Sequence, residues 1–334
     1  MKYKKILITG SEGFIGSHLV ESLVRKGFKV RAFVLYNSFQ SLGWLNQIEK
    51  QKNLEIFFGD IRSYDSVNQA LKDCDAVIHM AALIGIPYSY KTPKSYLDTN
   101  IIGTYNVLEA SNRNQIKKVI ITSTSEVYGT ANYVPIDEKH TLNPQSPYAA
   151  SKISADHLSM SYYYSFNLPV TILRPFNTFG PRQSPRAVIP ALIKQFLKSD
   201  VVKLKVGNLS PTRNFNFVED TINSFEKALN TKRCIGKIIN IGSNYEVSVK
   251  DLIKLLEKIS KKKVSKIIFD QKRVRKNTSE VFRLSASNKL AKKILSWKPR
   301  YHNKKGFEKA LSITYEWFEK NMDKEYFKNF DYDF

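Results

Sequence analysis

The chain has 334 residues, of which 42% are apolar and 12% aromatic, while only 14 are glycine and 12 are proline. This composition excludes collagen-like, low-complexity and wholly disordered chains, and the length suffices for two domains. Lys and Arg number 53 against 30 Asp and Glu, a formal net charge of +23. Because the lysines are spread over the whole chain, we expect no nucleic-acid partner but a positive field that favours anionic small molecules such as nucleotide diphosphates.

The cysteines and histidines exclude two further kinds of site. Cys74 and Cys234 provide no disulfide framework, and the five histidines have no metal-ligand spacing. No stretch reaches the roughly 18 apolar residues of a membrane span, and the N-terminal apolar run is shorter than the core of a signal peptide. We therefore expect a cytoplasmic protein with no metal and no membrane partner.

In chain order, short apolar runs alternate with helical patterns. Strands are expected at residues 4–9, 29–36, 54–59, 76–80, 118–122 and 169–174, and helices at 14–25, 63–71, 94–112 and 147–166. This alternation predicts an α/β fold with a Rossmann-type, doubly wound parallel sheet. After residue 174 prolines break the rhythm, and one more strand (237–241) and two helices (249–259 and 304–320) are expected.

The expected elements divide the chain into two parts. Residues 1–180 together with about 214–260 are assigned to a dinucleotide-binding Rossmann domain. Residues from about 181 to 213 and from 261 to 334 are assigned to a smaller C-terminal lobe that binds the substrate.

Three glycines, Gly10, Gly13 and Gly16, separate the first expected strand from the first helix, with Phe14 and Ile15 before the last of them. Glycine permits a tight turn and close backbone approach, so bare amides at the helix N-terminus can hold a pyrophosphate. The pattern predicts a dinucleotide site. Other residues expected at this edge of the sheet are Tyr36, Asn37, Asp60, Ile61, Ala81 and Ala82. His79, by itself, is expected to be a packed core histidine.

The second expected strand ends in Leu35, Tyr36 and Asn37, without the carboxylate that usually binds the ribose 2′-hydroxyl. A 2′-phosphate would meet no like charge there, and Arg62 could pair with it. The form of the cofactor, NAD or NADP, therefore stays open. We expect NADP to be accepted at least comparably to NAD.

Tyr148 and Lys152 lie four residues apart, one turn along the same face of the expected helix. This spacing lets the ammonium lower the pKa of the tyrosine and yield a phenolate base near neutral pH. Together with the glycines, the pair resembles the extended short-chain dehydrogenase/reductase family over essentially the whole chain. The resemblance implies a tightly bound, recycled nicotinamide, with Tyr148 as base and Lys152 holding the tyrosine and the nicotinamide ribose.

Thr124, Ser125 and Glu126 follow the fifth expected strand. In this family, nucleotide-sugar 4,6-dehydratases carry Thr-Asp-Glu here, with the glutamate as base at C5, whereas simple epimerases usually lack an acid. UDP-glucuronate decarboxylases resemble this chain in carrying Thr-Ser-Glu. Since Ser125 replaces the aspartate, the acid for the departing C6 hydroxyl is unassigned, and Glu126 or a bound water must be considered.

Five stretches (residues 33–38, 86–90, 126–138, 173–178 and 209–213) are similar to the dehydratases that act on nucleotide-activated N-acetylglucosamine in the legionaminic acid pathway. The resemblance implies a UDP- or GDP-linked substrate, a 4-keto-6-deoxy product formed with retention at C5, and a homodimer that pairs the helices starting at residues 94 and 147. The substrate-binding residues that it implies are Asn177, Arg182, Val188, Arg213 and Arg275. The alternatives are a UDP-glucuronate decarboxylase, a 4-epimerase and a nicotinamide-sensing protein, although such sensors commonly lack the Tyr/Lys pair.

Overall fold

The computed structural model describes residues 3–48, 50–273 and 279–321. In these residues, a seven-stranded sheet has the order β11-β6-β5-β4-β1-β2-β3, and every pair of neighbouring strands is parallel. The strands are β1 (Lys5–Thr9), β2 (Lys29–Leu35), β3 (Leu54–Gly59), β4 (Ala76–His79), β5 (Lys118–Thr122), β6 (Val170–Pro175) and β11 (Lys237–Ile241). The predicted α/β, doubly wound fold is confirmed, and the strand order reverses between β1 and β4.

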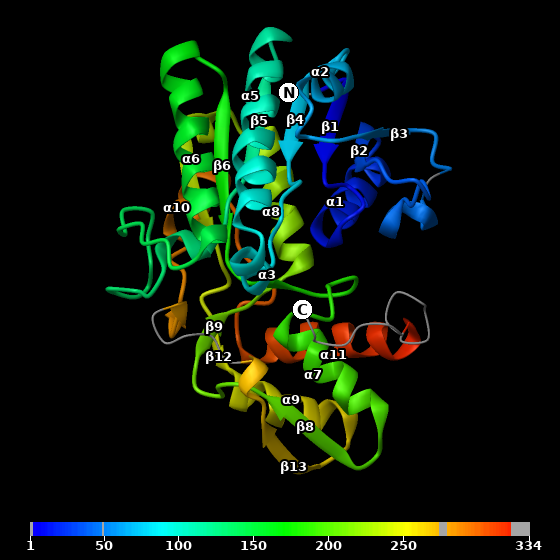
Figure 1. The fold of residues 1–334 in the computed structure, drawn as a ribbon, viewed down its shortest axis with the longest axis vertical. Helices are drawn as coiled ribbons and strands as arrows, with labels where there is room; N and C mark the ends of the chain where they lie inside the picture. Colours follow the sequence, from blue (N-terminus) through cyan, green and yellow to red (C-terminus); the bar gives the residue numbers. More distant parts are fainter. Residues whose placement is uncertain (1–2, 49, 274–278, 322–334) are drawn as a thin grey trace.

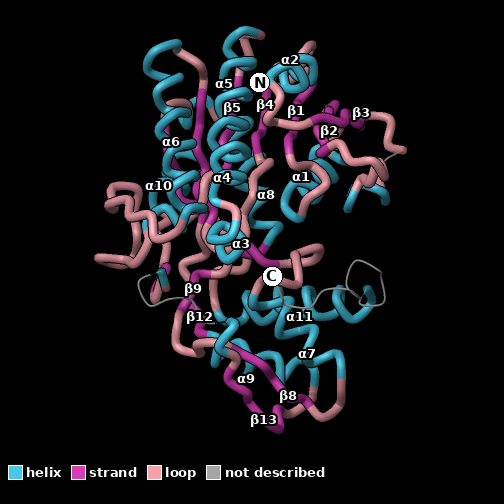
Figure 2. The backbone as a smooth tube through the Cα atoms, in the orientation of Figure 1, coloured by secondary structure: helices cyan, strands magenta, loops and turns pink. Residues whose placement is uncertain are grey.

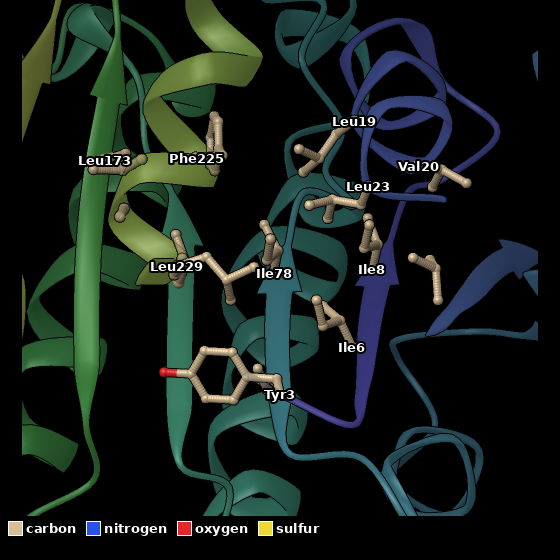
Figure 3. Packing of buried hydrophobic residues seen from close by; sticks show 14 of the residues in the cluster. Tyr3, Ile6, Ile8, Leu19, Val20, Leu23, Ile78, Leu173, Phe225 and Leu229 are labelled. Carbon is tan, nitrogen blue, oxygen red and sulfur yellow. The ribbon is translucent and has the colours of Figure 1, made fainter. Parts of the chain in front are cut away.

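Helices cover both faces of the sheet (Figure 1). One face carries α1 (Phe14–Arg25), α8 (Val218–Asn230) and α10 (Lys289–Leu295), and the other carries α2 (Tyr64–Leu71), α5 (Gly103–Arg113) and α6 (Pro147–Phe166). Figure 3 shows Leu23 of α1 and Leu229 of α8 packed toward Ile78 of β4. Burial on both faces explains why these strands are continuous apolar runs.

The predicted helix over residues 94–112 has three parts. It begins as α4 (Pro93–Tyr96), passes through a π-helical turn (Leu97–Ile102) and continues as α5. The π turn contains the buried Asn100. Its side-chain oxygen accepts a hydrogen bond from the backbone amide of Leu83, and its side-chain nitrogen donates to the carbonyl oxygen of Leu83 and to the hydroxyl of Ser151. The short α3 (Ile86–Lys91) precedes it, and 3-10 turns lie at Gly43–Gln47, Ser125–Tyr128, Lys232–Cys234 and Gln271–Arg273.

A second lobe lies beyond the carboxyl edge of the sheet (Figure 2). It contains α7 (Val188–Lys198), α9 (Val249–Ser260) and α11 (Lys304–Asn321), and β8 (Val202–Val206) pairs in parallel with β13 (Val264–Phe269). The short strands are β7 (Thr178–Phe179), β9 (Thr212–Asn214), β10 (Asn216–Phe217), β12 (Glu246–Ser248) and β14 (Arg283–Leu284). Phe196, Leu256 and Phe318 belong to the apolar core of this lobe.

The packing shifts the predicted boundaries between the two parts. Helix α9, assigned to the sheet domain, buries Leu252 and Leu256 in the core of the second lobe. Helix α10, assigned to the second lobe, buries Leu295 against α1, α8 and the sheet, and Trp297, two residues after its end, lies in the same core. The chain therefore crosses between the parts more often than predicted, because each amphipathic helix packs on the nearest apolar surface. Within the described ranges, no helix is long and apolar enough to cross a bilayer.

Candidate active site

A cavity of about 2000 Å³ runs along the carboxyl edge of the sheet and continues onto the second lobe. Of the predicted site residues, those that border it are Gly10, Gly13, Phe14, Ile15, Gly16, Asp60, Ile61, Ala81, Ala82, Thr124, Ser125, Glu126, Tyr148, Lys152, Asn177, Arg182, Val188 and Arg213. Tyr36 and Asn37 do not border it, and Arg275 lies outside the described residues. Residues far apart in sequence thus meet at one surface.

The glycine loop packs too tightly for side chains. A Cβ on Gly16 would lie 2.1 Å from the carbonyl oxygen of Gly10, and Gly10 itself has φ +67 with a Cβ position 2.8 Å from the backbone of Ala81. Gly13 precedes α1 without a side-chain cap, so the first amides of the helix are not closed off by a side chain. These open amides at the positive end of the helix dipole suit a pyrophosphate.

Two details at the ends of β2 and β3 correct the sequence analysis. The side chain of Asn37 is occupied by the backbone of its own loop, and Tyr36 is 65% exposed. Arg62 does not stand free for a phosphate, because it binds Asp60 through both Nε and NH2. Its hydrogen bonds hold the pKa of the Asp60 carboxyl below the usual range.

A third correction concerns the carboxylate that seemed to be missing from the end of β2. Oε1 of Glu12, from the glycine loop, accepts a hydrogen bond of 3.0 Å from the amide of Leu35, the last residue of β2. The carboxylate was expected on the strand itself, whereas Glu12 reaches the end of β2 from the glycine loop. Its position inside the glycine motif is the sequence signal for this placement.

The histidine that ends β4 is structural, as expected. Nδ1 of His79 lies 2.8 Å from Oγ1 of Thr9. Because this hydroxyl oxygen accepts hydrogen bonds from the amides of Met80 and Ala81, it donates its own proton to the ring. Burial lowers the pKa of His79 to about 3 and keeps the ring neutral. His79 therefore fixes Thr9 and, through it, the backbone before Ala82.

Tyr148 and Lys152 lie on the first turns of α6, which Ser146 caps by accepting the amide of Ala149. Both side chains are buried, and Nζ of Lys152 donates to the carbonyl oxygen of Thr122 at 2.7 Å. Burial raises the pKa of Tyr148, the hydrogen bond from Thr124 opposes this rise, and the charge of Glu126 adds to it. Burial therefore opposes the phenolate that the spacing from Lys152 predicts.

Thr124, Ser125 and Glu126 form the turn directly after β5. Oγ1 of Thr124 accepts the amide of Glu126 at 3.2 Å, and the Glu126 side chain is half-buried at the cavity wall. This arrangement holds a carboxylate beside Thr124 and within the same cavity as the phenol of Tyr148.

A buried polar network lies beneath this turn. Oδ2 of Asp156 accepts hydrogen bonds from Ser123 at 2.7 Å and from Nε of Arg174 at 3.0 Å. Arg174 also donates to the hydroxyl of Tyr128, which in turn donates to Asn240. With side-chain exposures of only 3% and 2%, Arg174 and Asp156 form a desolvated ion pair that fixes the turn from below.

The predicted substrate residues differ in how they are placed. Nδ2 of Asn177 is buried without a partner at the cavity wall, and Val188 begins α7. Arg213 lies 3.4 Å from Glu280. Arg182 needs correction as a phosphate ligand, because its terminal nitrogens bind Glu21 and Ser17 of α1.

Other groups that border the cavity were missed by the sequence analysis. Tyr96 packs edge to face against Tyr148, with ring centroids 6.2 Å apart. Three cationic residues also border the cavity: Arg186, Lys205 and Arg273. No motif marks these cations, because each belongs to a separate segment that only the fold brings to the cavity.

The parallel sheet, the glycine cradle and the paired tyrosine and lysine beside a second lobe define the extended short-chain dehydrogenase/reductase class. A model of the family described as "GDP-mannose 4,6 dehydratase" matches residues 7–310. The chain belongs to this family of nucleotide-sugar dehydratases and epimerases.

Its relatives carry out more than one reaction. The chain is 36% identical over 273 residues to a dTDP-D-glucose 4,6-dehydratase of Dictyostelium discoideum, covering 77% of this chain and 62% of that protein. It is 34% identical to a putative UDP-glucose 4-epimerase of Methanocaldococcus jannaschii, covering 92% and 97%. The structure of a Bacillus cereus UDP-glucuronic acid 4-epimerase with UDP-glucuronic acid and NAD superposes with a TM-score of 0.85 at 32% identity, covering 95% and 99%. Family membership alone therefore does not decide between dehydration and epimerisation.

Proposed function

We propose that this protein is a nicotinamide-dependent 4,6-dehydratase that converts a UDP- or GDP-linked N-acetylglucosamine to its 4-keto-6-deoxy sugar, for legionaminic-acid-type sugar biosynthesis. The observation that carries the proposal is the carboxylate of Glu126, half-buried in the same cavity as Tyr148. Oxidation at C4 alone needs no such group, whereas elimination needs a base at C5. The similarity of residues 126–138 to dehydratases of this pathway supports N-acetylglucosamine as the sugar of the substrate.

The cavity fits a nicotinamide dinucleotide. The cradle that a Cβ would fill at Gly16 and the uncapped amides of α1 suit the pyrophosphate, and Tyr148 and Lys152, which border the same cavity, would hold the nicotinamide end. NAD is supported by its presence in the Bacillus cereus relative. When bound, the oxidised nicotinamide supplies a positive charge and the acceptor and later donor of the hydride.

The chain's own residues account for the proton movements. Tyr148 takes the proton of the C4 hydroxyl, and Thr124 donates a hydrogen bond to the same oxygen. The 4-keto group then acidifies C5, so that Glu126 can remove that proton. The C6 hydroxyl leaves as water, and Glu126, now protonated, or a bound water supplies its proton, since Ser125 is too weak an acid. C6 of the resulting 5,6-double bond would then take back the hydride removed from C4, and C5 would take a proton from solvent, which completes the 4-keto-6-deoxy sugar.

The substrate grip and the oligomer follow the same proposal. Asn177 and Arg213 would bind the diphosphate, and Val188 would line the pocket of the base.

We also propose a homodimer in which α5 and α6, neighbours on one face of the sheet (Figure 1), pair with those of a second copy. Exposed apolar side chains support this surface: Leu97, Ile102, Tyr105, Tyr164 and Phe166.

A UDP-glucuronate decarboxylase is the second candidate. It needs a cation near the sugar carboxylate, and Arg186 borders the cavity close enough for its charge to lower the pKa of Tyr96 against the effect of burial. A 4-epimerase is the third candidate, supported by the relatives that carry that name.

The test is mass spectrometry of the products from a panel of nucleotide sugars, run in ordinary and in heavy water. We expect UDP- or GDP-N-acetylglucosamine to give a product lighter by one water, with solvent deuterium at C5. A product of unchanged mass would identify an epimerase. Carbon dioxide from UDP-glucuronate would identify a decarboxylase, and both results would overturn the proposed function.

A further inference from the structure

Glu12 carries a carboxylate oxygen that the protein leaves without a partner. Its Oε1 accepts the amide of Leu35, but Oε2 is buried and has no hydrogen-bond partner, although Glu12 borders the cavity. A buried carboxylate oxygen without a hydrogen-bond partner destabilises the folded protein. A side chain kept in this state at a ligand site indicates a ligand that donates a hydrogen bond to it.

The backbone holds Glu12 in place from two sides. Its carbonyl oxygen accepts the amide of Trp44 at 3.2 Å, and a Cβ on Gly43, whose φ is +53, would lie 2.7 Å from that oxygen. Trp44 is itself packed edge to face against Trp317 of α11. The carboxylate therefore sits at a fixed position between the glycine loop and the end of β2.

The end of β2 is where the adenosine ribose lies in dinucleotide-binding sheets of this type. We propose that Oε2 of Glu12 accepts a hydrogen bond from a ribose hydroxyl there, so that Glu12 selects NAD, with its free 2′-hydroxyl, over the 2′-phosphorylated NADP. This inference rests on the proposed dinucleotide site. The acid comes from the glycine loop, only two residues after Gly10, rather than from the strand.

The surrounding charges favour the same selection. A 2′-phosphate has no proton to offer a carboxylate at neutral pH and would meet its negative charge in a partly desolvated position. Arg62 is bound by Asp60, and the Asn37 side chain is occupied by its own loop. The expectation that NADP is accepted comparably to NAD depended on an end of β2 without a carboxylate, and Glu12 removes that premise.

The experiment measures the dissociation constants of NAD, NADP and NAD lacking the 2′-hydroxyl by titration calorimetry on nucleotide-free full-length protein. For the wild type we expect NADP and the 2′-deoxy analogue each to bind at least about tenfold more weakly than NAD, as for a lost hydrogen bond to a charged group. Glu12→Gln keeps the shape and an acceptor for the Leu35 amide. It should reduce the NAD-to-NADP preference by about tenfold or more.

Asp65→Asn is the matched control, since it removes one negative charge from an exposed residue that does not border the cavity, and the preference should stay unchanged. Thermal melting shows whether Glu12→Gln is folded, and the wild-type comparison of three ligands stands even if it is not. Equal binding of all three ligands by the wild type, or an unchanged preference in folded Glu12→Gln, would overturn the role of Glu12 alone. Binding of none of them would overturn the dinucleotide site itself, and the inference with it.

Discussion

In the sheet domain, Glu126 borders the cavity directly after a buried strand, whereas in the second lobe Arg213 borders it from a strand of only three residues. The turn that carries Glu126 follows β5 and is anchored through Ser123 by the buried pair of Arg174 and Asp156, each at most 3% exposed. Arg213, on the three-residue β9, has a side chain that is 14% exposed, pairs with Glu280 at 3.4 Å and donates to the carbonyl oxygen of Thr212 at 3.0 Å. We expect the sheet side of the cavity, where the chemistry is proposed to occur, to be the rigid side, and the second lobe to be the proposed grip on the nucleotide sugar.

The largest effect is expected from a substitution in the buried ion pair on the rigid side of the cavity. Arg174→Met leaves Asp156 charged and buried without its partner, so the free energy of unfolding should fall by about 3–5 kcal/mol, measured by urea denaturation. Arg113→Met, which breaks an exposed pair with Glu109 on α5, should leave the midpoint unchanged. If both variants behave alike, the buried network does not stabilise the site.

The next effect is expected from a substitution that removes the proposed base without disturbing its surroundings. Tyr148→Phe should lower turnover by at least about 100-fold, equivalent to about 2.7 kcal/mol, while the melting temperature and dinucleotide binding are retained. Tyr164→Phe, on the exposed side of the same helix, is the control. Turnover close to the wild type in Tyr148→Phe would remove Tyr148 from the mechanism.

The grip of the second lobe should respond differently. Arg213→Met should raise the KM for the nucleotide sugar by about tenfold or more, with a smaller change in kcat, because its proposed interaction is with the diphosphate rather than with the reacting carbons. Steady-state kinetics separates the two parameters. A fall in kcat with an unchanged KM would place Arg213 with the chemical machinery and erase the contrast between the two sides.

The last expected effect, small near neutral pH, is a pH dependence of stability from the sheet domain. Burial holds the pKa of His79 at about 3, against 6.5 for the free side chain. The unfolded chain therefore binds a proton that the folded chain excludes, and stability is lost as pH falls from about 6.5 toward 3, by up to about 1.4 kcal/mol per pH unit. His79→Gln should flatten this slope in urea titrations, whereas a variant of the exposed His157 should not. An equal slope in His79→Gln would contradict the buried neutral ring.

The contrast between the two regions also explains what the sequence could predict. The prediction of seven parallel strands, six of them in one alternating series, is confirmed. A strand that is buried on both faces is an apolar run, so it can be recognised without tertiary information. The glycine loop and the Tyr148 and Lys152 pair were likewise local patterns. Their assigned roles stay predictions.

The failures arise where tertiary contacts decide. A strand-end acid was sought on β2 itself, but Glu12 reaches that position from the loop after β1. Arg182 looked like a phosphate ligand until the fold brought Glu21 of α1 within 2.9 Å of its guanidinium. A lowered pKa of Tyr148 was inferred from its spacing to Lys152 alone. The spacing does not show that the side chain is buried, and burial raises that pKa.

The central claim is that Glu126 makes this site a dehydratase, and Glu126→Gln tests it most directly. The amide keeps the size of the side chain but cannot remove the C5 proton, so oxidation at C4 should proceed while elimination stops. We expect reduced cofactor to accumulate, seen by its near-ultraviolet absorbance, when UDP- or GDP-N-acetylglucosamine is added, with no product lighter by one water. Wild-type rates of water loss in Glu126→Gln would contradict the account.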